Sequence, residues 1–205
     1  MLKKSPIILI GGGGHCRSSI DVIESTGIYD IKGIVDIKKL SDIETLGYPY
    51  LGDDDQLELN IQKYHNVLVT VGQIKSSAVR GTIVEKAKKC NANFPTIISS
   101  RAKIARTSII GKGVIVMHDA VVNSNTLVGD YSIINTKALV EHDCIIGSFS
   151  HVSTGVILNG GVSIGNQTFI GSSVVVTQGV VIGDNVIIGA GEVVKRNIFK
   201  GEIIR

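Results

Sequence analysis

The chain of 205 residues is poor in aromatic side chains. It has no tryptophan, and the aromatic share is only 4%, whereas glycine reaches 24 residues. This combination is unusual for a compact α/β enzyme and favours an architecture of stacked aliphatic side chains joined by many tight turns. Hydrophobic residues make up 43% and charged residues 19% of the chain, a balance typical of globular proteins and not of disordered ones.

Further absences exclude several function classes. The net charge is only +3, and no run of lysine and arginine forms a basic stripe, so we expect no nucleic-acid partner. The apolar run Ile7–Ile10 is too short to span a membrane, and no segment resembles a signal peptide. Cys16, Cys90 and Cys144 are odd in number and lack a CxxC spacing, which predicts reduced thiols in a cytoplasmic protein without a metal centre.

A six-residue repeat dominates the second half of the chain. From Ile104 onward every sixth residue is aliphatic, without a break in register. The sixteen positions are Ile104, Ile110, Val116, Val122, Val128, Ile134, Val140, Ile146, Val152, Leu158, Ile164, Ile170, Val176, Ile182, Ile188 and Val194. A helix would show a period of 3.6 residues and a β-sandwich strand a period of 2, so neither fits.

A longer period of eighteen residues lies on top of the short one. Glycine recurs at this interval, and we expect it to relieve backbone strain at turns. Its positions are Gly111, Gly129, Gly147, Gly165 and Gly183. Eighteen residues therefore form one coil of three short strands, and stacking at about 4.8 Å makes five coils about 24 Å tall. The repeat predicts a parallel β-helix, whose hand the repeat alone does not give.

The first hundred residues follow a different pattern, in which strands and helices alternate. We expect strands at residues 7–10, 31–36, 66–71 and 94–98, and helices at 17–24 and 76–89. Such an order predicts a small parallel sheet of Rossmann type. The domain organisation expected is 1–100 for this α/β domain and 101–205 for the β-helix.

A glycine-rich turn follows the first predicted strand. Backbone N–H groups at a helix N-terminus suit a phosphate or another anion, which favours a nucleotide-sugar ligand. Cys16 stands where a dinucleotide fingerprint has its last glycine, so NAD is a weaker alternative, and a purely structural turn is a third. Asp36, at the end of the second strand, is either an acceptor for a ligand hydroxyl or a solvated carboxylate.

Chemistry on a β-helix must come from side chains at its turns, and two turns carry a His-Asp pair. Histidine is the usual general base near neutral pH, and an adjacent carboxylate can orient it. His142 has carboxylates on both sides, and Gly160 stacks on it one coil later, where its N–H could meet a thioester oxygen. His118 lies 24 residues earlier, on another face, and is the weaker candidate. Both could instead be surface residues.

Other residues have simpler interpretations. His151 takes a position that is usually small or aliphatic, which indicates a packing role as readily as a functional one. His65 precedes a predicted strand and needs no role in a site. Cys144 takes an inward position of its hexapeptide, so we interpret it as part of the core and not as a nucleophile.

The chain resembles the NeuD/PglD-type bacterial sugar acetyltransferases of the hexapeptide-repeat superfamily. The resemblance runs from IILIGGGGH (residues 7–15) to the last coil. Its most specific parts are NTKALVEHDCIIG (residues 135–147) and FSHVS (residues 149–153). The resemblance implies a left-handed β-helix and a homotrimer that binds acetyl-CoA between neighbouring prisms. It also implies acetylation of an amine or hydroxyl on a bacterial surface sugar, with the N-terminal domain holding a nucleotide sugar.

Site residues follow from the matched motifs. His142 is implied as the base, Asp143 as its orienting carboxylate, where a longer Glu occurs in the family, and Gly160 as the oxyanion donor. The nucleotide-linked amino sugar is assigned to Gly13, Gly14, His15, Asp36 and Gly72, and acetyl-CoA to His151, Ser172 and Ala190. Family members often carry Gly-x-Pro-Ala after the last coil. The different segment 200–205 predicts that part of the usual CoA contact is missing.

The expected function is therefore N-acetylation of a nucleotide-linked amino sugar by direct transfer. Two alternatives stay open. An O-acetyltransferase of a sialic-acid-like sugar would share every motif, and a non-catalytic structural β-helix would bind no CoA thioester.

Overall fold

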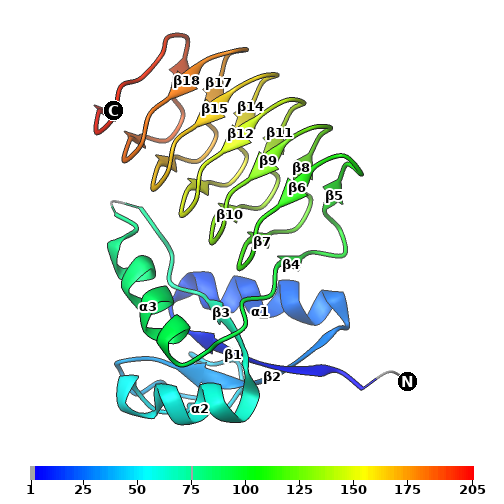
Figure 1. The fold of residues 1–205 in the computed structure, drawn as a ribbon, viewed down its shortest axis with the longest axis vertical. Coiled ribbons are helices and arrows are strands. Elements are labelled where there is room, and N and C mark those ends of the chain that lie inside the picture. Colours follow the sequence, from blue (N-terminus) through cyan, green and yellow to red (C-terminus); the bar gives the residue numbers. More distant parts are fainter. Residues whose placement is uncertain (1–2, 75) are drawn as a thin grey trace. The chain divides into compact units, whose positions relative to one another are not determined.

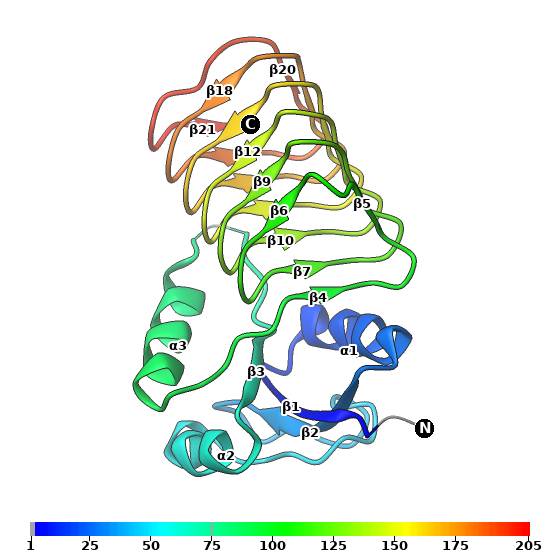
Figure 2. The same cartoon turned by 45° about the vertical axis from the view of Figure 1, so that its right-hand side comes forward.

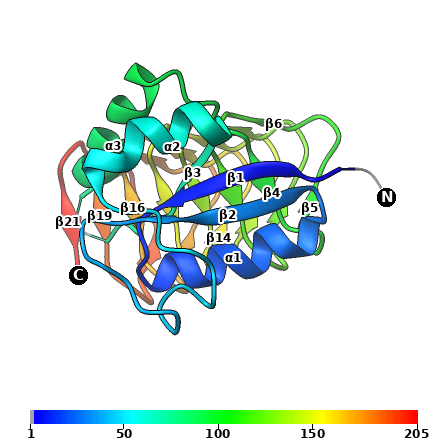
Figure 3. The same cartoon turned by 90° about the horizontal axis from the view of Figure 1, so that it is seen from below.

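A three-stranded parallel sheet in the order β2-β1-β3 forms the centre of the N-terminal part of the computed structural model, which describes residues 3–74 and 76–205. Its strands are β1 (Ser5–Ile10), β2 (Tyr29–Val35) and β3 (Asn66–Val69), and its helices are α1 (Gly14–Thr26), α2 (Leu57–Tyr64) and α3 (Ala78–Lys89). Figure 3 shows α1 on one face of the sheet and α2 and α3 on the other. The central strand β1 is therefore buried on both sides, which explains its uninterrupted run of aliphatic residues.

The sequence predicted most of these elements and missed two. Helix α1 begins three residues earlier than expected. Its C-cap is Gly27, which takes a left-handed conformation (φ 66°) and donates its N–H to the Glu24 carbonyl. The missed elements are the 3₁₀ turn η1 (Asp54–Gln56) and the helix α2 that follows it. Only Leu57 and Ile61 of α2 are buried, and two apolar residues one turn apart make too short a pattern to recognise.

The prediction of a strand at residues 94–98 in the N-terminal sheet was wrong. Only Ile97–Ile98 form a strand, β4, and Ile97 pairs with Ile115 of the β-helix. Ile98 lies six residues before Ile104, so the hexapeptide register begins one repeat earlier than the sequence pattern indicated. The chain divides into two compact units. One runs to Gly72 and resumes over Ala78–Pro95, and the other combines residues 73–77 with Thr96–Arg205.

Eighteen two-residue strands form the three parallel sheets of the second unit, a parallel solenoid of the left-handed β-helix class (Figures 1 and 2). The seven-stranded sheet contains β4 (Ile97–Ile98), β7 (Ile115–Val116), β10 (Ile133–Ile134), β13 (His151–Val152), β16 (Phe169–Ile170), β19 (Ile187–Ile188) and β21 (Ile203–Ile204). The six-stranded sheet contains β5 (Lys103–Ile104), β8 (Val121–Val122), β11 (Leu139–Val140), β14 (Ile157–Leu158), β17 (Val175–Val176) and β20 (Val193–Val194). The five-stranded sheet contains β6 (Ile109–Ile110), β9 (Leu127–Val128), β12 (Ile145–Ile146), β15 (Ser163–Ile164) and β18 (Val181–Ile182).

The predicted hexapeptide positions are confirmed as the second residue of each strand from β5 to β20, and together they fill the prism. The strict repeat ends after Val194. Ile198 pairs with Ile182 and Ile203 with Ile187, so each lies sixteen residues above its partner instead of eighteen. The last coil is thus two residues shorter than the others, yet its aliphatic residues Ile198 and Ile204 still pack against the core.

The glycines that recur every eighteen residues serve close approach and not a strained turn. A Cβ at Gly147 would lie 2.5 Å from the carbonyl carbon of Gly165, and one at Gly165 would lie 2.5 Å from the nitrogen of Asp184. Neither glycine has a positive φ. The left-handed positions are occupied mainly by other residues, such as Asp143 (φ 59°) and Gln167 (φ 58°). The expectation that these glycines relieve turn strain was therefore wrong, because the missing side chain makes room for the next coil.

Small polar residues inside the prism carry a regular set of hydrogen bonds. The Ser150 hydroxyl donates to the Gly165 carbonyl at 2.7 Å and accepts the Thr168 N–H at 3.1 Å. Ser132 and Thr168 make the equivalent pairs one coil below and one coil above. Each hydroxyl thus satisfies two buried backbone groups that the strand ladder leaves unpaired.

Replacing Ser150 by alanine is expected to lower the free energy of unfolding by about 1–3 kcal/mol, because two buried backbone groups lose their partner. Urea unfolding followed by circular dichroism would measure the change. Ser148→Ala is the matched control, since Ser148 lies at a partly exposed corner. Equal stability of the two variants would contradict a structural role for the hydroxyl column.

Candidate functional site

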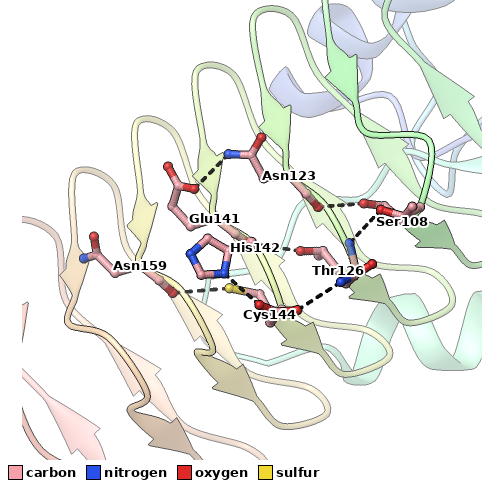
Figure 4. A network of polar contacts seen from close by, with 10 residues as sticks. Ser108, Asn123, Thr126, Glu141, His142, Cys144 and Asn159 are labelled. Carbon is pink, nitrogen blue, oxygen red and sulfur yellow. Dashed lines mark hydrogen bonds and ion pairs between the residues drawn. The ribbon is translucent and has the colours of Figure 1, made fainter.

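His142 lies in the turn between β11 and β12, and its backbone is held on both sides. Its carbonyl accepts the Gly161 N–H at 2.9 Å from the coil above, and the Asp143 N–H donates to the Ser124 carbonyl at 2.9 Å in the coil below. The Thr126 hydroxyl donates to the carbonyl of Glu141 at 2.9 Å (Figure 4). The stacked coils therefore hold the residue rigidly, although the ring itself is more than half exposed.

The His142 ring is oriented by a carboxylate. Nδ1 lies 2.7 Å from Oδ2 of Asp143, and Oδ1 of Asp143 also accepts the Asn125 amide at 3.3 Å. Since a carboxylate can only accept, Nδ1 carries the proton and Nε2 is left as the acceptor. The hydrogen bonds from His142 and from Asn125 hold the pKa of the Asp143 carboxyl below its ordinary value. The shorter side chain thus makes the contact that the resemblance assigns to a Glu.

Glu141, the other neighbour of His142, has its described hydrogen bond with a different residue. Glu141 accepts a hydrogen bond from the amide of Asn123 at 2.9 Å, one coil below (Figure 4). Of the two flanking carboxylates, only Asp143 makes a described hydrogen bond to the imidazole. The Cys144 thiol donates to the Asn159 carbonyl at 3.3 Å, and its side chain is fully buried. Burial raises the pKa of this thiol, so Cys144 is a core residue, as predicted from its inward position.

Gly160 lies against the His142 ring, as its position eighteen residues later predicts. A Cβ at this position would lie 2.7 Å from Cε1 and 2.8 Å from Nε2 of His142. The absence of a side chain at Gly160 is therefore what allows the imidazole to take this position. Any group that reacts at Nε2 would come close to the backbone of this glycine.

His118 lies at a different corner of the prism, after β7, as expected from its distance in sequence. Its Nδ1 lies 2.6 Å from the buried hydroxyl of Ser99, and the adjacent Asp119 pairs with Arg101 at 2.8 Å. The contacts described for the neighbouring carboxylate are with the guanidinium of Arg101. The contact described for the His118 ring is thus with a serine hydroxyl, whereas the His142 ring meets its neighbouring aspartate.

A mostly apolar groove of about 540 Å³ lies on the outer face of the seven-stranded sheet. Its volume is in the range of small-molecule sites. Its walls include two of the residues assigned to acetyl-CoA, Ser172 and Ala190, beside the outward side chains of Phe169, Ile187 and Ile203. Ile74 forms part of the wall, and among the lining residues that the structure describes Arg205 carries a charge.

His151 is buried, and both of its ring nitrogens are engaged. Nδ1 lies 2.8 Å from the Gln73 carbonyl, and Nε2 lies 3.1 Å from the amide of Asn135. A carbonyl can only accept, so Nδ1 carries the proton, and Nε2 accepts from Asn135. The ring meets that of Phe169, a wall of the groove, edge-on at 5.3 Å. His151 thus lies behind the groove with its ring held in place, which fits the packing interpretation and leaves its assigned contact with acetyl-CoA a prediction.

The residues assigned to the nucleotide sugar lie around the loop between β1 and α1. Gly13 is the N-cap of α1, and Gly14 and His15 begin the helix. A Cβ at Gly72, beyond the end of β3, would lie 3.6 Å from the Cβ of His15. These residues therefore gather at the carboxyl end of the parallel strands, where ligands bind in open α/β sheets.

Asp36 serves the glycine-rich loop itself. Its Oδ2 accepts the Gly12 N–H at 2.7 Å, and its Oδ1 accepts the Lys38 N–H at 2.9 Å. Each oxygen keeps a further lone pair, so a contact with a ligand hydroxyl stays a prediction. The carboxylate orients the loop whether or not a ligand is bound.

Sequence reasoning missed three residues that shape these sites. Asn135 holds His151, and Gln73 supplies the carbonyl acceptor described above. Arg80 is buried and donates from Nη1 to the carbonyls of Val69 and Val71, at 3.0 and 2.6 Å, and so fixes the segment before Gly72. No sequence pattern marks these contacts, because they join residues 9 to 78 positions apart.

The arrangement can remove a proton from a weak nucleophile, and it offers no described metal site. Nε2 of His142 is an oriented acceptor at the surface, beside a glycine backbone that leaves room for a reacting group. Over residues 3–74 and 76–205, no three His, Cys, Asp or Glu side chains cluster as metal ligands. None of the helices described is long and apolar enough to cross a membrane.

Two family profiles match the chain. The profile of the PglD N-terminal domain matches residues 6–87, and the profile of the bacterial transferase hexapeptide (six repeats) matches residues 161–195. No curated protein matched the chain in a sequence comparison.

Solved structures are similar over almost the whole chain. One is a histidine mutant of GDP-perosamine N-acetyl transferase from Caulobacter crescentus in complex with CoA and GDP-perosamine, with 32% identity and a TM-score of 0.89, over 99% of this chain and 94% of that one. Another is the acetyltransferase domain of PglB from Neisseria gonorrhoeae, with 30% identity and a TM-score of 0.88, over 98% of this chain and 96% of that one. WeeI from Acinetobacter baumannii, at 21% identity and a TM-score of 0.74 over 98% and 96%, shares the fold.

Proposed function

Because the chain belongs to the NeuD/PglD-type bacterial sugar acetyltransferases, we propose that it acetylates the amino group of a nucleotide-linked amino sugar. It is an acyltransferase, a sugar N-acetyltransferase whose co-substrate is acetyl-CoA. The Caulobacter crescentus neighbour binds CoA and GDP-perosamine, which supports an acceptor of the same chemical class. The product would be an N-acetylated nucleotide sugar for surface-glycan synthesis.

The observation that carries the mechanism is the His142–Asp143 pair. Direct transfer needs a base that takes a proton as the amine attacks, and Nε2 of His142 is the oriented acceptor. Asp143 would stabilise the imidazolium that forms, because its carboxyl stays ionised at neutral pH. The negative charge of Asp143 thus compensates the positive charge that develops on the His142 ring.

The proposed step makes one bond and breaks another. The amine nitrogen attacks the thioester carbonyl carbon, and its proton passes to Nε2 of His142. The Gly160 N–H donates to the oxyanion of the tetrahedral intermediate, as preorganised backbone donors do. The C–S bond then breaks, CoA leaves as a thiolate, and the imidazolium returns its proton to the thiolate or to solvent. No acyl-enzyme is formed, and the buried Cys144 takes no part.

We assign the substrates to two regions of the chain. The apolar groove with Ser172 and Ala190 suits the pantetheine arm of acetyl-CoA, and Arg205 at its edge suits a phosphate. The loop with Gly13, Gly14 and His15 offers N–H groups at the start of α1 to the diphosphate of the acceptor.

A homotrimer is part of the proposal. Within one prism, His142 lies at the corner between the six- and five-stranded sheets, whereas Ser172 and Ala190 follow strands of the seven-stranded sheet. A neighbouring copy would bring these separate corners to one active site. The outer face of the five-stranded sheet also exposes a column of aliphatic side chains, as a face that meets another copy would. They are Ile109, Leu127, Ile145 and Val181.

A thiol-release assay with acetyl-CoA would test the proposed acceptor. We expect turnover with at least one UDP-, GDP- or dTDP-linked amino sugar, and none with free sialic acid or with the matching sugars that carry a hydroxyl in place of the amine. Turnover of sialic acid alone would move the chain to O-acetylation. Release of no thiol with any acceptor would contradict the proposal.

A further inference from the structure

A short segment after β3, residues 73–77, packs on the β-helix, and we name it the strap; residue 75 lies outside the described residues. Three hydrogen bonds anchor it. The Gln73 carbonyl accepts from Nδ1 of His151 at 2.8 Å, the Gln73 amide donates to the Gln167 carbonyl at 3.5 Å, and the Ser77 hydroxyl donates to Oε1 of Gln167 at 3.3 Å. Gln73 and Ser77 are buried, so these two residues hold the strap on this unit.

Between these anchors, Ile74 is held in an exposed position. Its side chain is 69% exposed, yet it lines the apolar groove opposite the outer face of the sheet. The buried residues on either side hold this large aliphatic side chain in contact with solvent. It would gain apolar contacts when a ligand fills the groove. The occupant assigned to the groove is the pantetheine arm of acetyl-CoA, and this step rests on the proposed function.

We propose that the strap is a shared element of the two substrate sites, in which Ile74 binds the pantetheine arm and the strap links acetyl-CoA binding to nucleotide-sugar binding. The strap begins at the residue directly after Gly72, which is assigned to the nucleotide sugar. Acetyl-CoA that packs on Ile74 adds a contact to the anchored strap and so favours the backbone position of Gly72 that goes with it. Linkage is reciprocal, so the nucleotide sugar tightens the binding of acetyl-CoA by the same factor.

The first test concerns acetyl-CoA alone, with CoA as the unreactive probe. Ile74→Ala is expected to weaken CoA binding by about threefold to tenfold, because the apolar contact of a few methyl and methylene groups is lost. Isothermal titration calorimetry would measure it. Val79→Ala is the control, since Val79 is similarly exposed, at 61%, and does not line the groove. Unchanged affinity in Ile74→Ala would overturn the proposal. Failure of the wild type to bind CoA would instead overturn the proposed function.

The second test measures the coupling. The nucleotide diphosphate that corresponds to the acceptor found by thiol release serves as the unreactive probe. The wild type is expected to bind CoA about fivefold tighter, or more, when this nucleotide is saturating. Gln167→Ala removes the anchor of Ser77 without touching the groove wall, and it should reduce the factor to below twofold.

The matched control for the coupling is Asn185→Ala. Asn185 takes the same corner position one coil above Gln167, with a similar positive φ (56° against 58°), so both variants carry the same backbone cost. It should keep the coupling. The proposal would be overturned if the nucleotide tightened CoA binding by the same factor in Gln167→Ala as in the wild type. It would also be overturned if the nucleotide did not change the CoA affinity of the wild type. Slower amide exchange of the strap on addition of CoA would support it independently, and unchanged exchange would count against it.

Discussion

Replacing His142 by alanine is expected to lower kcat by about 10²- to 10⁴-fold with both substrates saturating, the usual loss when a general base is removed. The physical reason is the geometry at Nε2. Asp143 holds the proton on Nδ1 and leaves Nε2 as the acceptor beside Gly160, and alanine removes this acceptor. The KM values should change little, because the imidazole acts mainly in the transition state. Steady-state thiol release measures both parameters.

The control for this prediction is His118→Ala, which removes an imidazole from the same kind of turn at another corner. It should retain wild-type kcat. Circular dichroism spectra and gel-filtration volumes of both variants should match the wild type, since neither ring lies in the core. Near-normal turnover in His142→Ala would show that another group accepts the proton and would remove the central residue of the mechanism.

The second large effect is expected from a single added methyl group, in Gly160→Ala. The new Cβ would lie 2.8 Å from Nε2 of His142, well inside contact distance, so the ring must move. A displacement of about 1 Å of a catalytic group can cost about 10²-fold in rate, and we expect a loss of kcat of this order. Gly160 has no positive φ, so alanine costs the backbone little and the variant should fold normally.

Gly81→Ala is the control for the added methyl group, because a Cβ at Gly81 in α3 meets no atom within 4 Å. Kinetics should be unchanged there. A crystal structure of Gly160→Ala should show the imidazole rotated away from Asp143. Wild-type kcat in Gly160→Ala would mean that His142 works in a position other than the one described.

The sequence pattern predicted the β-helix because its fold is local and periodic. Each coil repeats the same eighteen-residue unit on the one before, so the inward column from Ile104 to Val194 can be read without knowledge of distant contacts. The prediction was wrong where the repeat was irregular or hidden. The strand at Ile97–Ile98 was attributed to the wrong sheet, and the two-residue shortening after Val194 escaped detection.

The same distinction applies to the candidate site, where the sequence predicted the features that follow from the repeat and not those that depend on side-chain conformation. Stacking by eighteen residues placed Gly160 on His142 from the sequence alone, and neighbouring positions paired His142 with Asp143. The part played by Asn125 follows from the same stacking, since it lies eighteen residues before Asp143, but its hydrogen bond depends on side-chain conformation. The eighteen-residue period predicts which residues stack on each other, but it does not predict which of their polar atoms form hydrogen bonds.

The sequence by itself determined the family, the solenoid and the histidine with its carboxylate, since each rests on residues close in the chain or separated by a fixed period. The tertiary structure alone decided which hydrogen bonds fix the tautomer of His151, how Ile74 comes to line the groove, and why the recurring glycines are needed. The reason is physical. The Gln73 carbonyl meets His151 across 78 residues, and the space that Gly165 leaves is set by the backbone of the next coil, so these relations exist only once the chain has folded.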